Sequence, residues 1–280
     1  MRSISPLRYP GGKACLYNLF LSILRDNDLL QRLYIEPYSG GCGLGLTLLL
    51  NGHMSRLHIN DVDRSIWAFW NLLLNNSASL VEKILSIPIT IEEWQRQREV
   101  QQYKDTVDAD TLGFSTFFLN RTNRSGVIHG GGVIGGLDQT GKYKIDCRFN
   151  RLELISRVER IVKYRGRIKL SNLDAEILIQ ESPAESVFYI DPPYFEKGSS
   201  LYMNAYNPND HKWLAQTLNN ELRPWILTYD DVCGIRDLYN GRLTHKIEVP
   251  YSVQTKRKGA ELMIFQPALR APKHLVPLLV

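Results

Sequence analysis

The sequence predicts an α/β protein with an open, Rossmann-like sheet, and three short apolar stretches carry this prediction. Residues 33–36, 57–60 and 187–190 each have the length and apolar character of a buried strand. Each stretch ends at a glycine-rich or acidic segment. Because open α/β sheets bind their ligands beyond the carboxyl ends of the strands, we expect the functional residues directly after these three strands.

The composition is that of an ordinary globular chain of 280 residues, of which 44% are hydrophobic and 22% are charged. This length suffices for one large domain with a smaller insertion. The formal net charge of +5 favours a polyanionic partner. The four cysteines lack paired spacing and the six histidines do not cluster, so we predict neither disulfides nor a metal site, which fits the cytoplasm.

The N-terminal stretch 8–13 places two glycines and Lys13 just before a helix predicted over residues 16–24. A glycine loop at a helix start exposes backbone N–H groups that can hold a carboxylate or a phosphate. The alternative is a plain turn with a solvated lysine. The apolar run that follows contains Asn18 and Ser22, so it predicts neither a signal peptide nor a membrane span.

Residues 33–50 have the pattern of a strand, a glycine-rich turn and a helix, the first unit of a nucleotide-binding sheet. The glycines lack Cβ atoms where a cofactor must approach the backbone. Leu46 occupies the place of the last glycine or alanine of the dinucleotide fingerprint, which counts against a nicotinamide cofactor. After the second strand, Asp61 lies where such sheets place a ribose ligand. Asp63 is better explained as the cap of the next helix.

Residues 75–165 interrupt this alternation and predict a helical insertion. Helices are expected over residues 80–85, over 90–103 behind a capping box, around the aromatic residues 114–118, and over 150–163. The long loop 119–136 is rich in arginine, asparagine and glycine, and Lys142, Lys144 and Arg148 follow it. Arginine and asparagine bond phosphates and base edges, so we predict a DNA contact, with a mobile solvated loop as the alternative.

The rest of the chain supplies further strands, expected over residues 168–170, 225–229, 244–249 and 261–266. Asp174 follows the first of them and either accepts a hydrogen from a cofactor adenine or caps a helix over residues 175–179. The sequence alone favours the cap. The turn 256–258 either touches phosphates with its basic tip or is a solubilising edge loop.

Residues 195–209 lie between two predicted elements and have the polar, aromatic composition of a lid, with Tyr202 and Tyr206 in reach of a bound base. We expect Asn209 or Asp210 to open the helix that follows.

The segment Asp191-Pro-Pro-Tyr194 suits one reaction, the methylation of an exocyclic amino group on a nucleobase. Two prolines cannot extend a sheet ladder, so Asp191 and Tyr194 are fixed at a rigid strand exit. The Asp191 carboxylate and the Pro192 carbonyl can accept the two amino hydrogens, which directs the nitrogen lone pair at a methyl donor. Tyr194 can stack on the base. The alternative is a proline-stiffened turn with a capping aspartate.

The order of motifs along the chain resembles that of one family over about residues 5–266. The motifs are Pro10-Gly-Gly-Lys13, Ile35-Glu-Pro-Tyr-Ser-Gly40, Asn60-Asp-Val-Asp63, Phe118-Leu-Asn-Arg121, Asp191-Pro-Pro-Tyr194 and Glu261-Leu-Met-Ile264. In this order they resemble the Dam-type, alpha-group (D12 class) DNA adenine N6-methyltransferases. The resemblance implies a mixed seven-stranded sheet that binds S-adenosylmethionine, formed by residues 1–74 and 166–280. It also implies an inserted helical target-recognition domain, residues 75–165, and a flipped adenine.

Together the residues and the resemblance assign the site. Catalysis is assigned to Asp191, Pro192 and Tyr194. S-Adenosylmethionine is assigned to Tyr9, Gly12, Lys13, Glu36, Pro37, Tyr38, Ser39, Gly40, Asp61, Val62, Asp174 and Asp191. Duplex DNA is assigned to Asn120, Arg121, Asn123, Arg124, Lys142, Arg148, Lys256 and Arg257. We expect a monomer without metal or membrane contact, and the resemblance allows a cognate restriction endonuclease as a partner.

Two rival functions stay open at this point. Methyltransferases that act on RNA carry a related Asp-Pro-Pro-Tyr, although the arginine-bearing insertion argues for duplex DNA. A DNA-binding protein without catalysis is the second rival, and the intact 191–194 segment and Asp61 argue against it. The glycine-rich stretch 130–136 lies outside the pattern associated with the family, so the target sequence does not follow from the resemblance.

Overall fold

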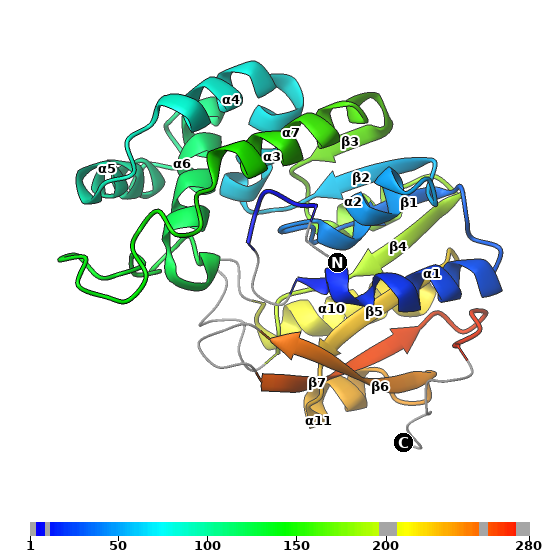
Figure 1. Ribbon diagram of the computed structural model, residues 1–280. Coiled ribbons are helices and arrows are strands. Elements are labelled where there is room, and N and C mark those ends of the chain that lie inside the picture. The colour runs from blue at the N-terminus through cyan, green and yellow to red at the C-terminus, as the bar shows by residue number, and fades with distance from the viewer. Residues whose placement is uncertain (1–3, 9–11, 196–205, 252–256, 273–280) are drawn as a thin grey trace.

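The computed structural model describes residues 4–8, 12–195, 206–251 and 257–272, which form one sheet with helices on both faces (Figure 1). The sheet has seven strands in the order β3-β2-β1-β4-β5-β7-β6. The strands are β1 (Leu33–Glu36), β2 (Arg56–Asn60), β3 (Ile168–Ser171), β4 (Ser186–Ile190), β5 (Trp225–Asp230), β6 (Thr244–Tyr251) and β7 (Arg257–Phe265). β7 runs antiparallel to β5 and β6, and the other pairs are parallel. The predicted mixed seven-stranded sheet is confirmed.

The central strands alternate between two hydrophobic cores, one on each face of the sheet. In β4, Val187 and Tyr189 belong to one core, while Phe188 and Ile190 belong to the other. Side chains of a strand point to opposite faces with a period of two, so a strand that is covered on both faces needs a continuous apolar run. Burial on both faces is therefore the physical origin of the apolar stretches from which the strands are predicted.

The helices divide between the two cores. Those on the first core are α1 (Tyr17–Asp26), α2 (Gly43–Leu50), α3 (Arg64–Asn75), α4 (Ser77–Ser86), α5 (Ile91–Gln102), α6 (Ala109–Thr122) and α7 (Arg151–Val162). Those on the second core are α8 (Ala175–Glu181), α10 (Pro208–Asn220) and α11 (Cys233–Leu238). The described residues also include three 3₁₀ turns, η1 (Lys13–Leu16), η2 (Arg124–Gly126) and η3 (Arg165–Arg167).

The helices α4 to α7 fall within residues 75–165 and gather beside the β2 and β3 side of the sheet (Figure 1). The rings of Phe69 in α3 and Phe117 in α6 stack with their centroids 5.9 Å apart. A Cβ atom on Gly113 of α6 would lie only 2.4 Å from the backbone oxygen of Ala68 in α3. The helical segment and the sheet are therefore joined by close packing between α3 and α6.

Side chains cap the starts of several helices. The capping residues are Asp63, Thr90, Asp108, Asn150 and Asp174. For Asp63 and Asp174 this confirms the cap that the sequence favours.

The start of α10 differs from the prediction. Its cap is Asn207, which accepts hydrogen bonds from the backbone of Asn209 and Asp210, and Pro208 takes the first helical position. Asp210 completes the capping box by accepting from the backbone N–H of Asn207 at 2.8 Å. The prediction of Asn209 or Asp210 as the first residue was wrong because proline fits the first turn of a helix, where no backbone donor is needed.

The closing pair β6 and β7 is longer than the predicted strands 244–249 and 261–266. Arg257 lies in β7, paired with Tyr251, and is not part of a turn as predicted. Lys256 lies outside the described residues. Within the described part of the chain, no helix has the length and apolar character needed to cross a bilayer.

Candidate active site

The carboxyl edge of the parallel strands brings the predicted residues together. Gly40 follows β1, Asp61 follows β2 and Asp191 follows β4. β1 lies between β2 and β4, so the strand order reverses direction between β1 and β4. Open α/β sheets bind ligands at such a switch point, and here its rim carries both predicted carboxylates.

Asp191 is held by hydrogen bonds from two other elements. The Lys13 ammonium donates to its two oxygens at 2.8 Å and 2.7 Å. The Thr228 hydroxyl of β5 donates to Oδ1 at 2.8 Å and lies 2.8 Å from the hydroxyl of Tyr189. The Lys13 side chain is 3% exposed and that of Asp191 is 23% exposed. The carboxylate is thus oriented from the protein side and still open toward solvent.

Lys13 is buried and ion-paired, so it is not the solvated lysine of the alternative. Burial by itself would lower its pKa, but the carboxylates of Asp191 and Glu261 raise the pKa above its usual value. Lys13 is therefore a buried ammonium that pairs with a carboxylate of the protein itself. The predicted contact of Lys13 with the cofactor stays a prediction.

Tyr194 is buried next to this ion pair. Its hydroxyl donates to Oε1 of Glu261 at 2.9 Å, and the Lys13 nitrogen lies 5.7 Å from the centre of its ring. The residue is 6% exposed. Stacking of a base on this ring therefore requires a rearrangement around it, and the stacking role stays a prediction.

Asp61 closes the glycine turn after β1. Its Oδ2 accepts from the Gly40 backbone at 2.8 Å, and its Oδ1 accepts from the Asp63 backbone at 3.0 Å. Burial and the neighbouring Asp63 carboxylate raise the pKa of Asp61 to about 7. The ribose role assigned to Asp61 stays a prediction, and the position of the carboxylate at the sheet edge agrees with it.

Glu36 ends β1 beneath the same turn. Its Oε1 accepts from the backbone of Gly45 at 2.8 Å, and a Cβ atom on Gly45 would lie 2.8 Å from that oxygen, so a larger residue there would displace the carboxylate. Burial raises the pKa of Glu36 to about 7. The Ser39 hydroxyl of this turn is buried and has no hydrogen-bond partner among the described residues.

These raised pKa values predict a pH dependence of the stability of the ligand-free protein. Between pH 4 and pH 7, roughly, folded Asp61 and Glu36 keep protons that the unfolded chain has lost. The folded state is therefore favoured on the acid side, and this stability is lost as the pH rises through about 7. Calorimetric melting temperatures should show the decline, and the double variant Asp61→Asn, Glu36→Gln should reduce its slope. An equal slope in that variant would assign the decline to other groups.

The remaining residues assigned to the cofactor are distributed around this edge. The hydroxyls of Tyr38 and Tyr206 lie 2.5 Å apart, Val62 is 45% exposed, and Gly12 is exposed ahead of η1. Asp174 caps α8 through the backbone of Glu176, at 2.9 Å. Tyr9 and Tyr202 lie outside the described residues.

Asn60, the first residue of the Asn60-Asp-Val-Asp63 motif, holds this edge together, a role that its sequence context does not predict. Its amide donates to the carbonyls of Pro37 and Leu173 at 2.9 Å and 3.0 Å, and its oxygen accepts from the Leu173 backbone at 2.9 Å. It therefore joins the segments that follow β1 and β3. A polar residue at the last position of an apolar strand was the available signal.

Three residues assigned to DNA are buried and bonded within the ligand-free protein, so their contact with DNA stays a prediction. Asn120 donates to and accepts from the backbone of Arg8 at 2.7 Å, and Arg121 donates to the carbonyl of Arg148 at 2.8 Å. Asn123 accepts from the indole of Trp94 at 2.6 Å. Burial and nearby cations lower the pKa of Arg121 to about 9. The loop needs these polar side chains because its irregular backbone lacks regular hydrogen-bond partners.

The Asn123→Ala variant is expected to lose DNA affinity by about tenfold or more, although the side chain is fully buried. In the wild type the Asn123 amide accepts from the Trp94 indole and donates to the carbonyl of Val127 at 2.7 Å. The substitution removes both hydrogen bonds. The loop then loses its fixed shape. Fluorescence anisotropy with labelled duplex DNA measures the effect. Substitution of the exposed Asn75 by alanine is the control, and equal affinities in the two variants would contradict this role.

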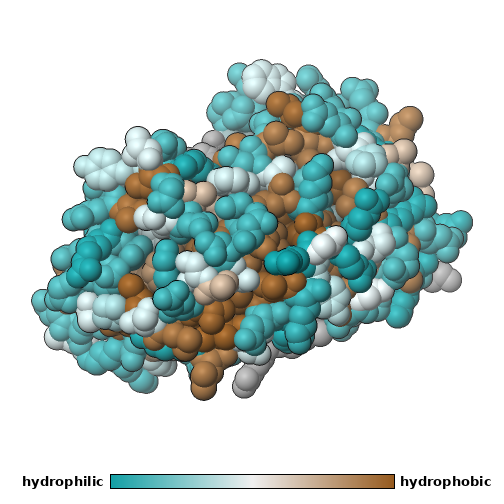
Figure 2. Space-filling model, turned by 90° about the horizontal axis from the view of Figure 1, so that it is seen from above, coloured by the Kyte–Doolittle hydropathy of each residue, from teal (hydrophilic) through white to brown (hydrophobic). Residues whose placement is uncertain are grey.

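The other loop cations are available for a partner. Arg124, Lys142 and Arg148 are exposed. Figure 2 shows one face of the molecule, on which hydrophilic side chains border an apolar band. Phosphate contacts require cations, so we do not expect the apolar band to bind the DNA backbone.

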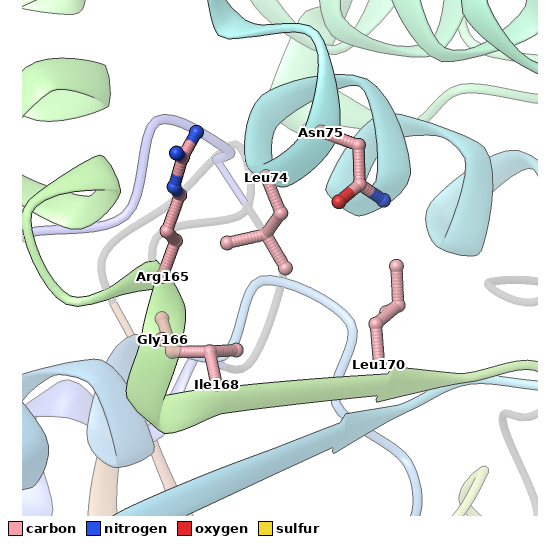
Figure 3. A pocket seen from close by; sticks show the side chains of 6 residues that line it. All are labelled: Leu74, Asn75, Arg165, Gly166, Ile168 and Leu170. Carbon is pink, nitrogen blue, oxygen red and sulfur yellow. The ribbon is translucent and has the colours of Figure 1, made fainter.

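A cavity of about 390 Å³ lies beside the edge strand β3, and Asp191 does not line it. Figure 3 shows its lining, in which Leu74 and Asn75 at the end of α3 face Ile168 and Leu170 of the edge strand β3, with Arg165 beside them. None of the residues assigned to catalysis or to the cofactor lines it. Within the described residues, no group of three His, Cys, Asp or Glu side chains is placed to hold a metal ion.

Comparisons with known proteins identify the family of this chain. A family model described as D12 class N6 adenine-specific DNA methyltransferase matches residues 9–256. The chain is 24% identical over 220 residues to the type II methyltransferase M.MjaIII of Methanocaldococcus jannaschii, with 73% of each chain covered. Among solved structures, it is similar to the "putative RNA methyltransferase PH1948" of Pyrococcus horikoshii, with a TM-score of 0.40 and 12% identity over 92% of this chain and 86% of that one. That structural likeness is too distant to bear on the function.

The family match spans most of the chain and includes Lys13, Asp61 and Asp191. The chain belongs to the D12 class N6 adenine-specific DNA methyltransferase family, and its reaction is the methylation of adenine in DNA.

Proposed function

We propose that this protein transfers a methyl group from S-adenosylmethionine to the exocyclic amino group of an adenine flipped out of duplex DNA. The observation that carries the proposal is the Asp191 carboxylate, which is fixed by Lys13 and Thr228 and still 23% exposed. An amino group on a nucleobase is a weak nucleophile because its lone pair is delocalised into the ring. A fixed acceptor at a strand exit can orient it.

The two acceptors have complementary tasks. Asp191 takes one amino hydrogen and the carbonyl of Pro192 takes the other, so that the nitrogen lone pair points toward the methyl donor. The negative charge of Asp191 stabilises the positive charge that grows on the nitrogen during transfer. Tyr194 lies beside the carboxylate and offers a ring on which the base can stack once the ring is uncovered.

The residues at the carboxyl edge fit S-adenosylmethionine, which supplies an electrophilic methyl group when bound. The Ser39 hydroxyl is buried without a partner among the described residues. Asp61 can accept the ribose hydroxyls, and the carboxylates at this edge suit a cationic sulfonium. The buried orphan hydroxyl marks a site that a polar ligand completes.

We assign target recognition to residues 75–165 and the backbone contacts to the exposed cations Arg124, Lys142 and Arg148. Exposed cations neutralise phosphates, and their contacts fix the register of the protein on the duplex. The buried Asn120, Arg121 and Asn123 shape the loop that carries them. Arg257 keeps its assignment to DNA as part of the proposal, and so does a cognate restriction endonuclease as partner.

The test is incubation of the protein with S-adenosylmethionine and unmethylated duplex DNA, followed by digestion to nucleosides and mass spectrometry. N6-Methyldeoxyadenosine is the expected product, and its formation should depend on the added donor. If no methylated adenine forms on DNA of varied sequence in the presence of the donor, the proposal is contradicted.

A further inference from the structure

Glu261 lies at the centre of this site and has no part in the reaction as described so far. It belongs to β7, where it pairs with Asp230 of β5, and its side chain is 0% exposed. A buried carboxylate is unfavourable unless specific partners compensate it. The partners of Glu261 therefore indicate why a carboxylate occupies this place.

Glu261 contacts the two residues that flank Asp191 in space. The Tyr194 hydroxyl donates to its Oε1 at 2.9 Å. The Lys13 nitrogen lies 3.5 Å from the same oxygen, and it lies 2.7 Å and 2.8 Å from the oxygens of Asp191. One buried ammonium thus stands between two carboxylates, with Asp191 as its nearer partner.

This arrangement matters because Lys13 and the target amine need the same acceptor. An ammonium has three donors, and in the ligand-free protein it engages both oxygens of Asp191. A cation so close draws electron density from the carboxylate and weakens it as an acceptor for the amine. A shift of Lys13 away from Asp191 would therefore make Asp191 a stronger acceptor for the adenine amine.

Glu261 offers Lys13 a second carboxylate with which it can pair. The 3.5 Å separation is longer than an ordinary hydrogen bond, so a small shift of the ammonium toward Glu261 forms a close ion pair there. Without Glu261 the same shift would leave a buried charge unpaired, which is strongly unfavourable. Lys13 would then stay on Asp191 and compete with the substrate.

We propose that Glu261 is a positioning residue: it takes over the Lys13 ammonium from Asp191 when the target amine binds, and it keeps the Tyr194 hydroxyl anchored. This inference rests on the proposed function, because it assumes that Asp191 accepts a hydrogen of the amine. Glu261 itself touches neither the base nor the methyl donor. Its effect should therefore appear in turnover and leave the binding of substrates nearly unchanged.

The Glu261→Gln variant tests this role because glutamine has the same shape and keeps an oxygen for Tyr194, while it removes the charge. We expect kcat to fall by about tenfold to a hundredfold, with KM for DNA and for S-adenosylmethionine within about threefold of wild type. The control is Glu185→Gln, the same chemical change at an exposed side chain that pairs with Arg56 at 3.1 Å. The control should keep the kcat of the wild type.

A double variant shows whether Glu261 acts through Lys13. In a Lys13→Met background the ammonium is absent, so adding Glu261→Gln should change kcat by less than about threefold. The melting temperature gives a second reading that does not depend on activity. Lys13→Met removes a cation that lies 3.5 Å from the buried Glu261 carboxylate, so the double variant should melt at a higher temperature than the single Lys13→Met variant.

Several outcomes would overturn the inference. The first is a Glu261→Gln enzyme whose kcat equals that of the Glu185→Gln control, and the second is a Glu261→Gln enzyme in which only KM changes. The third is a Glu261→Gln substitution that lowers kcat as much in the Lys13→Met background as in the wild type. The fourth is a double variant that melts at a lower temperature than the Lys13→Met variant. An Asp191→Asn variant measured alongside separates the two proposals. If Asp191→Asn keeps full turnover, the proposed function fails; if it loses turnover while Glu261→Gln does not, only the present inference fails.

Discussion

Replacing Asp191 by alanine is expected to lower kcat for DNA methylation by about a thousandfold or more. The change removes the acceptor that orients the amine and stabilises its developing charge. The fold should be retained, because the Lys13 ammonium still has Glu261 at 3.5 Å. Single-turnover methylation, with N6-methyldeoxyadenosine measured by mass spectrometry, separates this chemical step from binding.

Asp191→Asn is the matched control for this variant. It keeps the shape and one carbonyl oxygen, which can still accept from Thr228, so its loss should be smaller than that of Asp191→Ala. Both variants should bind DNA within about threefold of wild type, because the loss lies in the transition state. Turnover of Asp191→Ala within tenfold of wild type would rule out the proposed catalytic role.

Gly113→Ala is expected to lower the free energy of unfolding by about 2–3 kcal/mol. The added Cβ would meet the Ala68 backbone oxygen at 2.4 Å and its carbonyl carbon at 2.8 Å. Backbone atoms cannot swing aside as a side chain can, so α6 must shift away from α3. Urea unfolding followed by circular dichroism measures the change.

Gly43→Ala is the matched control for this effect. Its Cβ would lie 3.4 Å from the Cβ of Ala14, an ordinary contact, so its stability should match wild type or exceed it slightly. Equal stabilities of the Gly113→Ala and Gly43→Ala variants would show that α6 is not rigidly packed on α3. The assignment of the helices as a recognition domain fixed to the sheet would then lose its support.

The sequence alone predicts the sheet and the position of its acidic residues for a physical reason. Strands that are covered on both faces need continuous apolar runs. Such runs can be recognised in the sequence without knowing which strands lie beside them. A carboxylate or a proline pair that follows such a run must lie at the strand exit. Asp61 and Asp191 could therefore be placed at one edge from local patterns, as could the caps Asp63 and Asp174.

The end of α6 and the loop after it show where local patterns are insufficient. Arginine and asparagine at positions 120–124 have the composition of a nucleic-acid contact. The structure buries Asn120, Arg121 and Asn123 against the N-terminal segment and Trp94, and leaves Arg124 exposed. The same types of side chain that bond phosphates also form hydrogen bonds with the backbone groups of irregular segments, and burial decides between these two uses.

The catalytic environment likewise combines two kinds of information. The sequence by itself determines that an aspartate, two prolines and a tyrosine end the strand β4. Only the tertiary structure brings Lys13, Thr228 and Glu261 to them, from η1, β5 and β7. The reason is that the pairing of β7 between β5 and β6 is a long-range event, which sets a carboxylate beside residues that the local sequence does not specify.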